Sequence, residues 1–266
     1  MNKPANALTP DLIARLRAIV GDNHTLTDPD QQLPYVRELR DLYVGSAGVV
    51  LRPGSTGEVS KILALANAHG LPVVPQAGNT GLVGGQVPMN GEIVLSISRL
   101  KRVRALDPDG FTMTVEAGMT LAEVHAAADG INRLFPLSLP SEGTCQIGGN
   151  LGTNAGGVGV LAYGNTRQLV LGLEVVLADG RIWHGLSPLK KDNTGYDLRD
   201  LFIGSEGTLG VITAATLKLF PKPLEMATAF VALPSVDAAL PLFSMAQEAA
   251  GQSLTAFEIM CELALD

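Results

Sequence analysis

The sequence is poor in the residues that mark nucleic-acid, metal and disulfide-rich proteins. Only 17% of its 266 residues are charged, the net charge is −7, and Lys and Arg form no cluster. This pattern argues against nucleic acid or an anionic membrane as the main partner. The two cysteines, Cys145 and Cys261, lie far apart without a CxxC pair, and the four histidines show no ligand spacing. Neither a disulfide framework nor a metal site is therefore predicted.

Long apolar segments and targeting signals are also missing. No apolar run reaches the length of a transmembrane helix, and residues 1–10 show neither a signal-peptide apolar region nor an arginine-rich transit pattern. We therefore expect a cytoplasmic location and no integral membrane segment. Hydrophobic residues make up 46% of the chain, which is ample for a buried core. A small molecule is the expected partner.

Glycine is what the sequence has in quantity. Half of its 30 glycines lie within residues 143–210, and two glycine-rich loops occupy residues 75–88 and 140–157. Glycine lets successive backbone amides converge on an anion without help from lysine or arginine. Two such loops in differently patterned halves of one chain predict a dinucleotide bound between them. Neither loop contains GxGxxG, and no GxxxxGK[ST] occurs, so a Rossmann site or a P-loop is not expected.

The remaining patterns predict an α+β fold with two subdomains. A strand, helix and strand within residues 48–76, followed by a strand at 93–97, indicate a small parallel α/β unit. Alternation in residues 112–117 indicates a half-exposed strand that begins a second, larger and mainly antiparallel sheet. The pair Asp179 and Gly180 between two β-rich runs predicts a hairpin in that sheet.

Helix signals mark further elements and the end of the fold. Thr9 caps a helix that ends at Gly21, and the pairs Ser55/Glu58 and Thr120/Glu123 are capping boxes. After Pro223, residues 227–235 alternate as a strand does, and residues 236–251 are helical. We therefore divide the chain into an N-terminal helical segment (1–43), a cofactor-binding domain (44–223, with subdomains about 44–104 and 105–223) and the incomplete start of a second α+β domain (224–266).

Five motifs, in order, make the chain similar to a known family. They are GVVLRPGSTGEV, PQAGNTGLVGG, SEGTCQIGGNLGTNAGG, KDNTGYDLRDLFIGSEGTLGVIT and the exit PKP, and they cover roughly residues 44–223. This set resembles the FAD-binding (PCMH-type) domain of flavoproteins of the vanillyl-alcohol oxidase type. Within that family it is most similar to the branch of D-2-hydroxyglutarate and D-lactate dehydrogenases. The resemblance implies a two-subdomain fold that holds FAD.

The resemblance also implies which residues hold FAD. The first loop would wrap the pyrophosphate, the second would line the ribityl and isoalloxazine groups, and Gly207 and Val211 would lie near the ribityl chain or adenine. The FAD-binding candidates are Pro75, Gly78, Asn79, Thr80, Gly81, Leu82, Gly84, Gly85, Pro140, Gly143, Thr144, Gly148, Gly149, Asn150, Thr153, Asn154, Gly207 and Val211. Some branches attach flavin through a histidine in the first loop, but AGNTG contains none, so non-covalent FAD is expected.

The implied chemistry is oxidation of a D-2-hydroxy acid, such as D-2-hydroxyglutarate, D-lactate or glycolate, to the 2-oxo acid by hydride transfer to flavin N5. Such a reaction needs a base and cations for the carboxylate. In the family these groups, and a divalent metal where present, belong to a C-terminal domain, so we expect no catalytic residue and no metal ligand in this chain. The implied electron acceptor is a quinone or an electron-transfer flavoprotein, and a homodimer is one possible assembly.

Two alternatives and several residues stay open at this stage. The chain could be a non-catalytic FAD-binding or electron-transfer subunit whose partner carries the substrate site, or a member with other chemistry, such as an enolpyruvyl-sugar reductase or an aryl-alcohol oxidase. His125 and His184 are expected to be surface or satisfied polar groups, and Cys145 to be a buried filler or a flavin contact. The charges Lys190, Lys191, Asp192 and Arg199 are either solvated or face a second domain.

Overall fold

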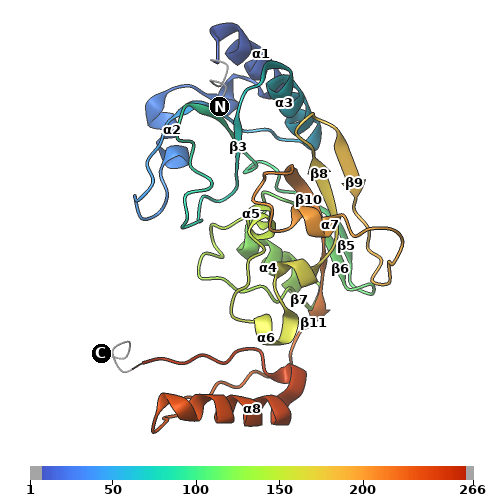
Figure 1. Cartoon of the computed structure of the whole chain (residues 1–266). Helices are drawn as coiled ribbons and strands as arrows, with labels where there is room; N and C mark the ends of the chain where they lie inside the picture. Colours follow the sequence, from blue (N-terminus) through green and yellow to red (C-terminus); the bar gives the residue numbers. More distant parts are fainter. Residues whose placement is uncertain (1–7, 262–266) are drawn as a thin grey trace.

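The computed structural model describes residues 8–261 and contains two main sheets with helices packed on them (Figure 1). The smaller sheet has the strand order β1-β2-β4-β3. Its strands are β1 (Thr25–Leu26), β2 (Ala47–Leu51), β3 (Val73–Gln76) and β4 (Glu92–Ser96). The last three are parallel, as predicted, whereas β1 adds an antiparallel edge. The segment 1–43 therefore supplies a strand to this sheet as well as helices.

The helices beside the smaller sheet are α1 (Pro10–Val20), the 3₁₀ helix η1 (Asp22–His24), α2 (Pro29–Val36) and α3 (Thr56–His69). Two of them, α1 and α3, begin at the predicted caps, whereas η1 and α2 were not predicted. The Thr9 hydroxyl accepts from the Leu12 N–H (3.3 Å), and the Ser55 hydroxyl from the Glu58 N–H (3.2 Å). The Glu58 carboxylate, however, accepts from the Gly54 N–H (2.7 Å), so this capping box is only half formed.

The larger sheet is antiparallel throughout, with the order β5-β6-β10-β8-β9. Its strands are β5 (Val103–Asp107), β6 (Thr112–Glu116), β8 (Val170–Val176), β9 (Ile182–Gly185) and β10 (Val211–Lys218). The hairpin at Asp179 and Gly180 joins β8 to β9, as predicted. The expectation that β6 is half exposed is wrong: only Thr114 is not fully buried, because Met113 and Val115 pack in the core and Glu116 on the other face pairs with Arg102 and Arg104.

Short helices and a ribbon complete this half. They are α4 (Leu121–Asp129), α5 (Ile147–Gly152), α6 (Val160–Tyr163), η2 (Thr166–Leu169), α7 (Arg199–Phe202) and the paired strands β7 (Arg133–Leu134) and β11 (Phe220–Pro221). The predicted box at α4 is complete, since the Thr120 hydroxyl accepts from the Glu123 N–H (3.2 Å) and the Glu123 carboxylate from the Thr120 N–H (2.7 Å). One continuous core, including Leu95 and Leu173, joins the two sheets.

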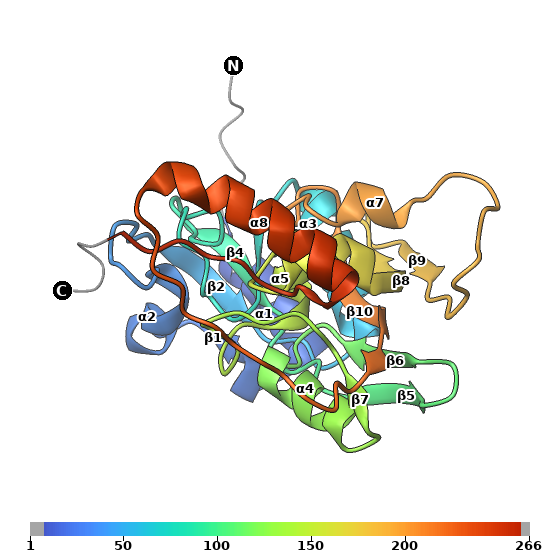
Figure 2. The ribbon, with the colours of Figure 1, turned by 90° about the horizontal axis from the view of Figure 1, so that it is seen from below.

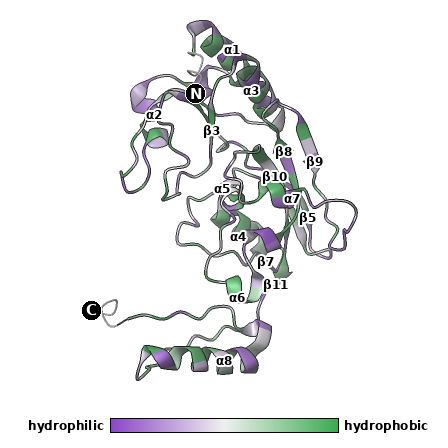
Figure 3. Ribbon diagram, viewed as in Figure 1, coloured by the Kyte–Doolittle hydropathy of each residue, from purple (hydrophilic) through white to green (hydrophobic). Residues whose placement is uncertain are grey.

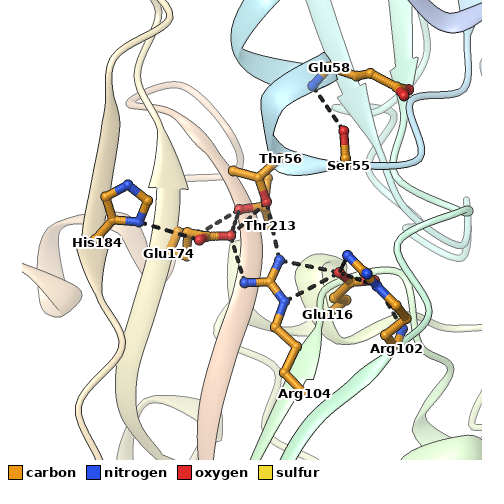
Figure 4. Close-up of polar contacts among 9 residues, drawn as sticks. All are labelled: Ser55, Thr56, Glu58, Arg102, Arg104, Glu116, Glu174, His184 and Thr213. Carbon is orange, nitrogen blue, oxygen red and sulfur yellow. Dashed lines mark hydrogen bonds and ion pairs between the residues drawn. The ribbon is translucent and has the colours of Figure 1, made fainter.

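A buried polar cluster also joins the two halves (Figure 4). Glu174 on β8 accepts hydrogen bonds from the hydroxyl of Thr56 on α3 (2.6 Å) and from the Arg104 guanidinium (3.0 Å). Arg104 also donates to Glu116 (3.2 Å), and the Thr213 hydroxyl donates to Glu174 (2.9 Å). Since every carboxylate here is paired, the burial of their charges is compensated, and the Thr56 hydroxyl ties α3 to the larger sheet.

The segment after Pro223 differs from the prediction. Residues 227–235 form no strand, because no described strand lies beside them to pair with, and Phe230 is 84% exposed. The helical part is confirmed as η3 (Val236–Ala238), α8 (Ala239–Ala250) and η4 (Gly251–Ser253). Figures 1 and 2 show α8 outside the two sheets, and Figure 3 shows apolar residues along it. None of its residues is buried. Residues 1–7 and 262–266 of the predicted segments lie outside the described chain.

Candidate functional site

A cavity of about 280 Å³ lies where three loop regions meet. The β3–β4 loop supplies residues from 75–86, the segment around α5 supplies residues from 139–155, and the start of β10 supplies residues from 206–212. The predicted FAD-binding residues that line it are Pro75, Gly78, Asn79, Thr80, Gly81, Gly85, Gly148, Gly149, Asn150, Thr153, Gly207 and Val211. The structure therefore brings both glycine loops and the third segment to one cavity.

Missing side chains allow these loops to touch. A Cβ on Gly78 would overlap the carbonyl oxygen of Thr144 and would lie 3.0 Å from the Cα of Cys145, so the first loop rests directly on the backbone of the second. A Cβ on Gly207 would lie 2.9 Å from Pro75 Cγ. Gly207 also has φ +78°, a conformation that L side chains rarely adopt. Glycine at these positions is therefore a condition for the cavity's shape.

The first loop presents free amides. The backbone N–H groups of residues 78–82 have no hydrogen-bond partner within the described chain. Asn79 adopts φ +53°, and its side-chain amide fixes the loop by donating to the carbonyls of Pro34 (2.9 Å) and Arg37 (2.7 Å). Because consecutive amides without a protein partner can converge on one acceptor, this loop is suited to an anion such as a pyrophosphate.

Charge and polarity elsewhere in the cavity fit a large, mostly neutral ligand. Glu206 is the one charged residue among the described residues that line it. Three lining side chains carry buried atoms without a hydrogen-bond partner in the described chain: Asn79 Oδ1, Gln146 Oε1 and Asn150 Nδ2. An unpaired buried polar atom costs about 1–3 kcal/mol, so these three atoms are an unfavourable feature of the lining. The amides of the first loop match the anionic pyrophosphate of FAD.

Some predicted residues lie outside the cavity lining. The Leu82 carbonyl accepts a hydrogen bond from the Arg40 guanidinium, and Gly84 leaves room for the ring of Tyr43. Asn154 Oδ1 accepts a hydrogen bond from the Arg167 N–H (2.9 Å). The others are exposed on the turn before α5: Pro140, Gly143 and Thr144. Turn formation accounts for these positions in the structure.

Several lining residues were missed by sequence reasoning. They are Gln76, Ala77, Val83, Gln86, Ile97, Leu139, Ser141, Gln146, Gly152, Ala155, Glu206, Gly210 and Ile212. Gln146 and Glu206 stand inside two of the recognised motifs, so motif membership was a usable signal for them. Ile97 and Ile212 have the pattern of ordinary core residues, and only the tertiary structure brings them to the cavity.

The structure also places the histidines, the cysteine and the charged residues whose roles the sequence left undecided. His125 Nε2 lies 2.8 Å from the Leu137 carbonyl, and exposed His184 lies 3.4 Å from Glu174, so both have partners outside the cavity. Cys145 is buried but does not line the cavity. Arg199 donates to the carbonyls of Val170 (2.9 Å) and Leu171 (2.8 Å), which makes it structural. Lys190, Lys191 and Asp192 are exposed.

Residues 8–261 were also compared with the requirements of metal sites and membrane spans in terms of their side chains and helices. No group of three or more His, Cys, Asp or Glu residues in this part of the chain is arranged to hold a metal ion. None of the helices found there has both the length and the apolar character needed to cross a bilayer.

The chain is similar to curated proteins along almost its whole length. It is 44% identical over 257 residues to the mitochondrial D-2-hydroxyglutarate dehydrogenase of Danio rerio, covering 97% of this chain and 48% of that protein. The protein of the same name from Bos taurus is 43% identical over 258 residues, covering 97% of this chain and 47% of that protein. The chain thus spans about half the length of the curated relatives it matches.

These relatives correct one expectation. Both are named as mitochondrial, so the cytoplasmic location expected from the sequence is wrong. That expectation rested on the absence of a targeting pattern in residues 1–10, and such an absence does not determine the compartment.

The fold and the family are both identified by comparison. An alkyldihydroxyacetonephosphate synthase structure has a TM-score of 0.76 at 19% identity, covering 94% of this chain and 51% of that one, and this likeness confirms the predicted α+β fold. Residues 47–185 match the family described as the FAD binding domain, which confirms FAD as the cofactor. This match takes in both glycine loops and the β8–β9 hairpin, so the chain belongs to the FAD-binding domain family.

Proposed function

We propose that this chain is the FAD-binding part of an oxidoreductase that oxidises a D-2-hydroxy acid, of the D-2-hydroxyglutarate type, to the 2-oxo acid. The observation that carries the proposal is the 43–44% identity, over 97% of the chain, to two D-2-hydroxyglutarate dehydrogenases. The cavity supports it, because the glycine loops that the chain shares with flavoproteins converge there. When bound, FAD supplies the two-electron acceptor that takes hydride from C2 of the hydroxy acid.

The chain's own residues bind and orient the cofactor. The free amides of residues 78–82 balance the pyrophosphate charge. The rest of the cofactor contacts the lining residues of the second loop, together with Gly207 and Val211. The described residues that line the cavity include neither histidine nor cysteine, which supports non-covalent binding. The hydrogen bond from Thr56 to Glu174 links the smaller sheet's helix α3 to the larger sheet outside the cavity.

We assign residues 44–223 to the FAD-binding domain and residues from 224 onward to the start of a substrate domain. The exposed apolar residues of this last segment support that assignment, since Leu224, Met226 and Leu240 are at least 75% exposed. The electron acceptor is proposed to be a quinone or an electron-transfer flavoprotein, and the assembly a homodimer.

One observation favours a second candidate, a non-catalytic FAD-binding subunit. Apart from Glu206, the described lining residues offer no charged group, and so no cation for a substrate carboxylate. A subunit that holds FAD for a partner would need none. The two candidates differ in whether a hydroxy acid reduces the flavin in the product of this gene alone.

The test is anaerobic reduction of the bound flavin. The chain, and any longer product of its gene, are loaded with FAD and mixed with D-2-hydroxyglutarate, with the L enantiomer as the control. We expect D-2-hydroxyglutarate to bleach the visible flavin absorption of the longest product, and the L enantiomer to leave it unchanged. Flavin that stays oxidised with D-2-hydroxyglutarate, D-lactate and glycolate would refute the dehydrogenase proposal and favour the non-catalytic subunit.

A further inference from the structure

Residues 34–43, here named the strap, end α2 and lead toward β2, and they lie against the first glycine loop (Figure 1). The Asn79 side chain donates to two carbonyls of the strap, at 2.9 Å and 2.7 Å. The Arg40 guanidinium donates to the Leu82 carbonyl. The run of free amides at residues 78–82 is therefore tied to the strap near both of its ends.

Two more contacts join the strap to the start and the return of the loop. The Gln76 side chain, where β3 ends, donates to the carbonyl of Tyr35 on the strap (2.8 Å) and to that of Gln86 on the loop (3.0 Å). A Cβ on Gly84 would lie 2.7 Å from Cγ of Tyr43, so the Tyr43 ring packs on bare backbone. The strap thus supports the loop along its length.

The strap supports the loop from outside the cavity. Residues 78–81 line the cavity, whereas no residue of the strap is among the described residues that do. The strap can therefore affect a ligand only through the loop. It also lies outside residues 47–185, the part of the chain that matches the FAD-binding family.

Glu38 gives the strap its shape. It is 2% exposed, and its carboxylate accepts from the N–H of Arg40 (2.9 Å) and from the N–H of Leu42 (2.6 Å). The same carboxylate lies 3.8 Å from Arg40 Nε. A buried carboxylate has to be compensated, and these compensating groups belong to the strap itself. Glu38 therefore fixes the turn from which the Arg40 side chain reaches the loop.

A glycine-rich loop needs such support if it is to bind an anion well. Glycine has many accessible backbone conformations, so a free loop would lose much conformational entropy when its amides converge on a ligand. A loop that is already held in the binding conformation loses less, and more of the interaction free energy appears as affinity.

We infer that the strap holds the empty first loop in its anion-binding shape, with Arg40 and Glu38 as positioning residues for the cofactor pyrophosphate. Arg40 acts by holding the Leu82 carbonyl, and Glu38 acts by placing Arg40. This inference rests on the proposed function only in taking FAD as the ligand, and it requires no substrate.

The experiment measures binding of FAD and of ADP, which carries the same pyrophosphate, by calorimetry to the wild-type chain and to Arg40→Gln. We expect the variant to weaken both ligands about tenfold and by the same factor. Arg17→Gln is the matched control. Arg17 has a similarly exposed side chain (41% against 47%), but it pairs with Asp22 (3.4 Å), and the substitution removes the same charge. It should leave both affinities within about twofold.

Two further measurements separate positioning from general stability and from charge. The ligand-free Arg40→Gln chain should lose no more than about 4 °C of Tm, because the lost contact is partly exposed. A larger loss of Tm would make the role merely structural and overturn the inference. The ratio of the variant and wild-type Kd values should persist in about 1 M salt, where the screening length is about 3 Å. A ratio that falls to one would assign the effect to charge alone and also overturn it.

A double-mutant cycle tests the role of Glu38. Glu38→Gln keeps the side-chain shape and should weaken FAD binding in the wild-type background by more than in the Arg40→Gln background, because Glu38 acts through Arg40. Equal factors in the two backgrounds would refute that part of the inference.

The comparison of ligands supplies the remaining outcomes. Unchanged FAD affinity in Arg40→Gln, or a loss for FAD without a loss for ADP, would overturn the inference. If both ligands weaken as expected but no hydroxy acid reduces the bound flavin, only the proposed function fails. If a hydroxy acid reduces the flavin while Arg40→Gln binds FAD as the wild type does, only this inference fails.

Discussion

Replacing Gly78 by alanine should separate the two glycine loops. The new methyl group would overlap the carbonyl oxygen of Thr144 and press on the Cα of Cys145 at 3.0 Å. Both are backbone atoms, so no side-chain rotation relieves the contact, and one loop must move. Overpacking of this kind costs about 1–3 kcal/mol. For a chain of this size each kcal/mol lowers Tm by roughly 2–4 °C.

Gly143→Ala is the matched control for this change. Gly143 belongs to the second loop, but no heavy atom lies within 4 Å of the position of its Cβ, and its φ is not positive. Thermal unfolding and FAD titration of both variants form the assay. We expect Gly78→Ala to lower both Tm and FAD affinity and Gly143→Ala to change neither. Equal behaviour of the two variants would refute the claim that contact between the loops shapes the cavity.

Three further outcomes follow from the same structure. Burial raises the pKa of Glu174, but hydrogen bonds from Thr56 and Thr213 and the charge of Arg104 outweigh it, so its pKa lies below the ordinary 4.5. Its contribution to stability should therefore be present above pH 4.5 and be lost as the pH falls below it. Glu174→Gln should make the free energy of unfolding, measured by denaturant titration, fall less steeply as the pH drops below 4.5. Gly148→Ala should destabilise the chain through Ile97 Cδ1, and adding Ile97→Val, which removes that atom, should restore part of the loss of Tm. FAD at about 100 times its Kd should stabilise the chain by about 2.7 kcal/mol in thermal melts, whereas an unchanged Tm would show that the folded chain does not bind it.

Local signals were sufficient for much of the fold. Helix caps at Thr9 and Thr120 and the turn at Asp179 and Gly180 are set by neighbouring residues, and the structure confirms them. The strand expected at 227–235 was wrong, because alternation describes a strand's faces and does not supply the partner that pairs with its backbone.

The site was predictable in outline only. Glycine runs identify loops whose amides can approach an anion, and both loops do line the cavity. The contact between Gly78 and Thr144 and the unpaired state of Gln146 depend on tertiary packing of segments far apart in the sequence. Turn glycines such as Gly84 and cavity glycines such as Gly85 have the same local signal, so sequence reasoning grouped them together.

The central claim is that this cavity holds FAD, and the most direct test is an FAD titration of the purified chain. Fluorescence of the single tryptophan, Trp183, reports binding through energy transfer to the flavin, with circular dichroism as the control for folding. The account predicts saturable quenching at one FAD per chain, reversed by excess ADP. A folded chain whose fluorescence and Tm do not respond to FAD would contradict it.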